Sequence, residues 1–155
     1  MKRVLIMAVA ACCFLLVLAG CGKSNYISFD DVYTSLNKEV DFGDNMTEMS
    51  DKALENFYFI YDTDILEDYK IYMDETGATA NEIALFRLAK ESDMTTVETI
   101  VKNRINDLKV SYEDYNKDEY YKVENAVMKT KGKYIMMVIS PDSKAAASVL
   151  DEYLK

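Results

Sequence analysis

Histidine and tryptophan are absent from the 155-residue chain, and its three cysteines all lie within the first 21 residues. Without histidine the chain lacks the commonest general base and metal ligand. The cysteines are Cys12, Cys13 and Cys21, so nothing after residue 21 supplies a thiol nucleophile or a disulfide pair. The composition therefore excludes the most frequent routes to catalysis, and the stability of the later segment has to come from packing.

Positive charge is also scarce, with 18 basic against 27 acidic residues. Removing a leader over residues 1–20 takes Lys2 and Arg3 away, which leaves 16 basic residues and a net charge of −11. Nucleic-acid binding depends on neutralising phosphates with lysine and arginine, so we expect no nucleic-acid partner. The remaining ~135 residues are enough for one domain with an ordinary core.

The first 21 residues have the three parts of a lipoprotein signal. A basic stretch (Lys2, Arg3) precedes an apolar run over residues 4–18, and Leu-Ala-Gly-Cys21 ends it. The run is shorter than the ~20 residues that a membrane-spanning helix needs. Small residues directly before a cysteine suit cleavage and lipid attachment. We therefore expect a signal peptide over 1–20 and a diacyl (palmitate-type) anchor on Cys21.

This anchor sets the expected location and partners. Two acyl chains contribute ~0.8 kcal/mol for each buried CH₂ group, which is enough for stable membrane attachment. Residues 21–27 read as a short polar tether, and residues 28–155 as the folded domain. We expect a protein on the extracytoplasmic face of the cell membrane, with the lipid bilayer as its first partner and an envelope protein or cell-wall component as the second.

The hydrophobic pattern predicts an α+β fold in a single domain. Residues 82–89 are mostly apolar on both faces, so this strand is expected at the centre of the sheet. Lys131-Gly132 has the size of a hairpin turn, which makes the sheet at least partly antiparallel. Residues 41–47 are expected to be a loop. Helices are expected over 29–40, after Ser50, over 94–114, 117–124 and from 142 to about 154, and the strands of a small, mainly antiparallel four-stranded sheet over 69–73, 82–89, 126–130 and 133–140.

The segment Asp114-x-Asn116-x-Asp118 has the first three ligand spacings of a calcium loop. Glu119 stands where such a loop needs glycine, and Asn125 stands where it needs a bidentate glutamate. Asn116 with Glu119 instead has the layout of a capping box. A solvated helix junction is therefore the favoured interpretation.

Other polar groups match catalytic or cation-binding motifs only in part. Ser35 and Lys38 have the spacing of a serine acyl-enzyme without its accompanying motifs. No particular carboxylate pair points to glycoside hydrolysis. An acidic stretch favours an exposed loop, and whether it binds a cation stays open; it contains Asp62, Asp64, Glu67 and Asp68.

Aromatic and basic side chains supply the candidates for binding. Four tyrosines cluster around one helix junction, where tyrosine suits either a contact surface or packing; they are Tyr112, Tyr115, Tyr120 and Tyr121. Three lysines crowd the hairpin turn, where a solvated turn or contact with an anionic wall polymer are the two interpretations; they are Lys129, Lys131 and Lys133.

Residues 60–155 resemble an uncharacterised lipoprotein family of Gram-positive bacteria, the domain of unknown function 4358. The resemblance lies in Glu-Ile-Ala-Leu-Phe at 82–86, in the long helix that ends near Tyr112, and in Asn-Ala-Val-Met-Lys-Thr-Lys-Gly-Lys-Tyr at 125–134. It implies an exported, anchored domain and assigns no activity, cofactor or site residue.

We therefore expect a membrane-anchored lipoprotein that acts as a non-catalytic binding or interaction module, without a cofactor or a metal. Two alternatives stay open: a carboxylate-dependent cell-wall hydrolase and a weak calcium-responsive surface module. Of the individual site residues, only lipid attachment at Cys21 follows from a specific motif.

Overall fold

The computed structural model describes residues 26–155, so the expected signal peptide over 1–20 and the lipid-attachment residue Cys21 lie outside it. The described residues form five α-helices and a five-stranded sheet. In chain order the elements are α2 (Phe29–Glu39), β1 (Met46–Glu48), α3 (Lys52–Tyr58), β2 (Leu66–Asp74), β3 (Glu82–Leu88), α4 (Met94–Glu113), α5 (Lys117–Glu124), β4 (Val127–Lys131), β5 (Tyr134–Ile139) and α6 (Ser143–Tyr153).

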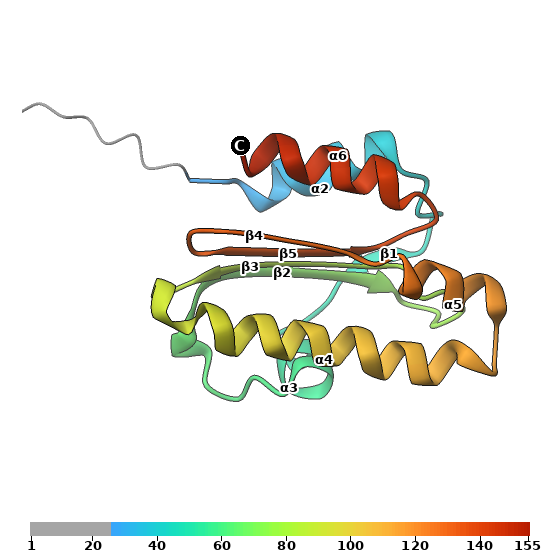
Figure 1. Cartoon of the computed structure of the whole chain (residues 1–155), viewed down its shortest axis with the longest axis horizontal. Helices are drawn as coiled ribbons and strands as arrows, with labels where there is room; N and C mark the ends of the chain where they lie inside the picture. Colours follow the sequence, from blue (N-terminus) through green and yellow to red (C-terminus); the bar gives the residue numbers. More distant parts are fainter. Residues whose placement is uncertain (1–25) are drawn as a thin grey trace, which may run out of the picture.

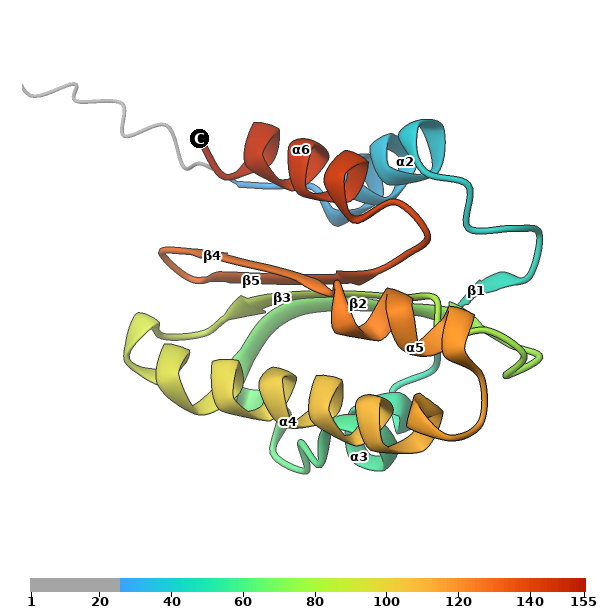
Figure 2. The ribbon, with the colours of Figure 1, turned by 45° about the vertical axis from the view of Figure 1, so that its right-hand side comes forward.

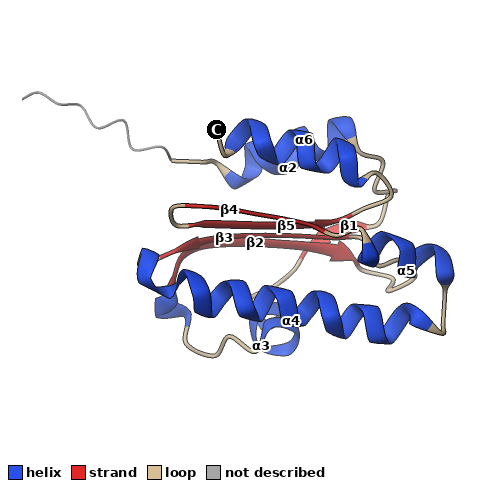
Figure 3. Ribbon diagram, viewed as in Figure 1, coloured by secondary structure: helices blue, strands red, loops and turns tan. Residues whose placement is uncertain are grey.

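The strands lie in the order β1-β2-β3-β5-β4, and every neighbouring pair is antiparallel. The expected α+β class is confirmed, as Figure 3 shows, but the expectation of four strands is wrong. The additional strand is β1, whose first two residues lie in the segment expected to be a loop. It has three residues, two of them exposed, so it has no alternating pattern to reveal it.

Helices cover both faces of the sheet and enclose two separate cores. α2 and α6 lie on one face, and α3, α4 and α5 lie on the other (Figure 1, Figure 2). The central strand β3 supplies side chains to both cores, as its two apolar faces predicted. Ala84, Phe86 and Leu88 pack with α4, while Ile83 and Leu85 pack with α2 and α6.

Local sequence signals explain where several elements begin and turn. The Ser28 hydroxyl accepts a hydrogen bond from the Asp31 amide and caps α2. The β4–β5 turn is Gly132-Lys133, one residue later than predicted, because Lys131 pairs with Tyr134. Gly132 has φ +54, a left-handed conformation that glycine adopts without steric cost. Within residues 26–155, no helix is both long and apolar enough to cross a bilayer.

Candidate functional site

Glu82, the first residue of β3, is a carboxylate buried between the sheet and α4. Glu82 is only 2% exposed. Arg104 of α4 donates to it from Nε at 3.2 Å and from Nη2 at 2.8 Å. The hydroxyl of Tyr58, at the end of α3, donates a further hydrogen bond to Glu82. A buried carboxylate needs such partners because its desolvation is costly.

The contacts among α3, β3 and α4 also set the protonation states of Tyr58 and Arg104. Burial and the neighbouring Glu82 charge raise the pKa of Tyr58 well above its usual value, so the phenol stays protonated and donates. Burial alone lowers the pKa of Arg104, but the Glu82 charge more than offsets this and raises it. The guanidinium also lies over the Phe57 ring, 4.8 Å from its centroid.

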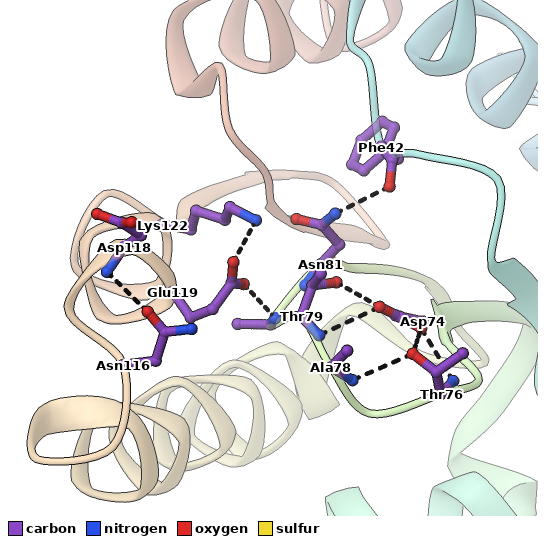
Figure 4. A network of polar contacts seen from close by, with 11 residues as sticks. Phe42, Asp74, Thr76, Ala78, Thr79, Asn81, Asn116, Asp118, Glu119 and Lys122 are labelled. Atoms are coloured by element: carbon purple, nitrogen blue, oxygen red, sulfur yellow. Dashed lines mark hydrogen bonds and ion pairs between the residues drawn. The ribbon is translucent and has the colours of Figure 1, made fainter.

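The loop between β2 and β3 continues this site, and its near end is organised by Asp74 (Figure 4). The Asp74 carboxylate accepts backbone hydrogen bonds from Thr76 at 2.9 Å and from Thr79 at 3.1 Å, and both hydroxyls also donate to it. Burial alone raises the pKa of Asp74, but these hydrogen bonds outweigh it and lower the pKa. The carboxylate therefore holds the loop in one shape.

The far end of the same loop is held by Glu119 of α5 (Figure 4). Glu119 accepts from the Ala80 amide at 2.6 Å and pairs with Lys122 at 2.7 Å. The predicted capping box is therefore only half right. Asn116 does cap α5, accepting from the Asp118 amide at 3.1 Å, but Glu119 reaches the loop 39 residues away in sequence.

A cavity of about 300 Å³ lies between this loop and α4, and we call it the loop cavity. Its polar walls include Glu82, Arg104 and the side chain of Tyr112. Its apolar walls are Met49, Phe57, Met73 and Leu108. The volume is at the lower end of the range for small-molecule sites, and the mixture of walls suits an amphipathic ligand.

The four tyrosines that the sequence singled out do not line one pocket. Tyr112 is half-buried and lines the loop cavity, and its ring lies 6.5 Å from that of Tyr115. Tyr115 is 80% exposed and Tyr121 is 59% exposed, whereas Tyr120 is half-buried. Only Tyr112 of the four therefore belongs to the candidate site.

The other polar candidates have structural partners. The Ser35 hydroxyl hydrogen-bonds the Tyr153 hydroxyl at 2.8 Å, and Lys38 pairs with its neighbour Glu39. Of the acidic stretch expected to be a loop, Asp62 accepts from the Asp64 amide and caps a short 3₁₀ turn, whereas Glu67 and Asp68 lie in strand β2. Across residues 26–155, no three acidic side chains are grouped so that they could hold a metal ion.

Sequence reasoning missed Glu82 and Arg104 as partners, although Arg104 carries a signal. Val97, Val101 and Leu108 of α4 are buried, and Arg104 lies on the same stripe. A charge at an inward helical position requires a buried partner. Nothing in the sequence indicates that this partner lies 22 residues earlier, at the start of a strand.

Comparison with curated proteins and with solved structures gives no match. A family model matches residues 38–140, which include every residue that lines the loop cavity. The match begins earlier than the 60–155 region expected from the sequence, and it stops before α6. The chain therefore belongs to the family described as a domain of unknown function (DUF4358).

Proposed function

We propose that this protein is an exported lipoprotein, anchored to the extracytoplasmic face of the membrane through Cys21, whose domain binds a ligand without chemical conversion. The anchoring proposal rests on one observation: the apolar run ends in Leu-Ala-Gly-Cys21. Four residues, 22–25, separate this cysteine from Tyr26. A link of this length spans at most about 18 Å, so the domain stays close to the bilayer.

The loop cavity supports a binding role. Its polar groups are already held in place, since Arg104 is fixed by Glu82 and the loop is fixed by Asp74. Fixed polar groups beside apolar walls lower the entropy lost when a ligand binds. The carboxylates of Glu82 and Asp74 both accept hydrogen bonds that stabilise the fold. Because they are engaged in this way, binding is favoured over acid–base chemistry at this cavity.

The anchor is tested by labelling the wild-type protein and the Cys21→Ser variant with radioactive palmitate in a bacterial host. We expect label and membrane fractionation for the wild type and neither for the variant. Protease added to intact protoplasts should digest the wild-type domain. Equal labelling of the two proteins, or protection of the domain from the protease, would rule the proposal out.

The binding role is tested with a photo-crosslinking amino acid in place of Tyr112, which lines the loop cavity. Tyr115 is the matched control because it lies three residues later, in the turn after α4, and is exposed. Irradiation in native membranes should yield an adduct from position 112 and not from position 115. Absence of an adduct, or the same adduct at both positions, would contradict a role for this cavity.

A further inference from the structure

A second and larger pocket lies at the end of the domain where the described chain begins, and we call it the hairpin-end pocket. Its volume is about 930 Å³. The start of α2, the turn between β4 and β5, and the end of α6 lie side by side at this end (Figure 1, Figure 2). Tyr26 and Ile27 line the pocket, so it opens beside the point where the tether joins the domain.

Arg87 of β3 supplies the central positive charge of this pocket. Its side chain is 17% exposed and lies over the Tyr26 ring, 4.4 Å from the centroid. Burial alone lowers the pKa of Arg87, but its hydrogen bond with Tyr134 and the nearby Glu67 charge raise it, so it stays charged. Its Nε is buried and donates no hydrogen bond to any acceptor within residues 26–155. A buried donor of this kind costs free energy unless an acceptor reaches it.

A β-bulge places a carboxylate beside this guanidinium. Leu66 pairs with Leu88 and Asp68 pairs with Arg87, so Glu67 is the extra residue between them. Glu67 lies 3.6 Å from Arg87 and 3.8 Å from Lys133, both longer than a hydrogen bond, and is about half exposed. Lys133 also donates to the Ala89 carbonyl at 2.7 Å, which leaves further N–H donors on its ammonium group.

The remaining charges around the pocket favour a ligand with both an anionic group and hydroxyl groups. Lys131 also lines it, is exposed, and forms no ion pair within residues 26–155. Lys155 lines the pocket as well, so four cationic side chains gather at one end of a strongly acidic chain. Asp31 and Glu152 lie on the pocket wall, where carboxylates can accept hydrogen bonds from hydroxyl groups.

We propose that the hairpin-end pocket binds a glycerol phosphate group, with the phosphate between Arg87, Lys131 and Lys133 and the hydroxyls toward Asp31 and Glu152. Such a group occurs in the headgroup of an anionic phospholipid and as a soluble metabolite. The lipid source follows if the anchoring at Cys21 proposed above holds, because the tether then keeps the pocket near the bilayer. Tethering also gives a high effective concentration of headgroups, so weak intrinsic affinity is sufficient.

The test is lysine acetylation of the mature acylated protein in nanodiscs, measured by mass spectrometry. Phosphatidylglycerol nanodiscs should slow acetylation of Lys131 and Lys133 about fivefold relative to phosphatidylcholine nanodiscs, because charge-assisted hydrogen bonds cover the amines. Lys129 is the internal control, since it lies on the same hairpin, pairs with Asp151 and does not line the pocket. Its acetylation rate should not change.

Variants and a soluble probe separate the possible outcomes. Arg87→Gln should abolish the protection; if it does not fold, Lys131→Gln should reduce protection of Lys133 and leave Lys129 unchanged. Protection by soluble glycerol phosphate alone would support the pocket and assign the soluble source. Equal rates in both nanodiscs with no effect of glycerol phosphate would overturn the proposal. Failure of the protein to join nanodiscs refutes the anchor, while the soluble probe still tests the pocket.

Discussion

Replacing Arg104 with methionine tests whether the buried ion pair with Glu82 organises the domain. The substitution keeps an unbranched side chain of similar length on α4 and removes the charge. Glu82, which is 2% exposed, then keeps only the hydrogen bond from Tyr58. We expect a large loss of stability because a buried carboxylate is left without its cation.

The size of the effect follows from burial. Removing one partner of a buried ion pair costs about 3–5 kcal/mol, and loss of the contact between Arg104 and the Phe57 ring adds about 0.5–1 kcal/mol. The Lys102–Glu98 pair on the same helix is the matched control, because its 2.6 Å separation is similar but its lysine is 56% exposed. We expect Lys102→Met to cost about 0.3–0.5 kcal/mol.

The assay is urea denaturation followed by far-UV circular dichroism, since the chain has no tryptophan to report by fluorescence. Adding Glu82→Gln to Arg104→Met should recover at least half of the lost stability, because the uncompensated charge is gone. A cost of Arg104→Met no greater than that of Lys102→Met would contradict a structural role for the buried ion pair. Additive stability losses from Arg104→Met and Glu82→Gln would contradict it as well.

Three further predictions concern single positions. Phe59→Gly should raise the free energy of unfolding by about 0.5–1 kcal/mol in the same urea assay, because Phe59 has φ +53 and an exposed ring; destabilisation would show that the ring packs. Glu119→Ala should cost about 1–3 kcal/mol and speed hydrogen exchange of the Ala80 amide, because both acceptor oxygens are gone, and unchanged exchange would contradict the role of Glu119 in holding the loop. Burial and a hydrogen bond to Asp51 raise the pKa of Tyr69 to about 12. The contribution of this hydrogen bond to stability is therefore present below about pH 10 and is lost as the pH rises from about 10 to about 12. Tyrosinate absorbance should detect this late titration, and Asp51→Asn should shift the pKa of Tyr69 toward about 10.

The sequence predicts the regular part of the fold because the periodicity there is strong. Residues 82–88 are apolar at nearly every position, and only a central strand with helices on both faces buries all of them. The cap at Ser28 likewise places the start of α2 within one residue. The three-residue strand β1 escapes prediction because it is short and mostly exposed, and its pairing with β2 is decided by tertiary contacts.

The polar site is much less predictable, because its contacts join residues far apart in sequence. Glu119 has a local interpretation as a capping residue, and the more distant Ala80 amide competes successfully for its carboxylate. Arg87 reads as one polar residue in an apolar strand, and its acidic neighbours Glu67 and Asp68 come from β2, where the bulge shifts the register. Local spacing cannot show either contact.

Intact mass spectrometry of the protein purified from bacterial membranes tests the anchoring proposal most directly. We expect a chain that begins at Cys21 and carries the added mass of a diacylglycerol group on that residue. A chain that retains residues 1–20, or a Cys21 with a free thiol, would contradict it.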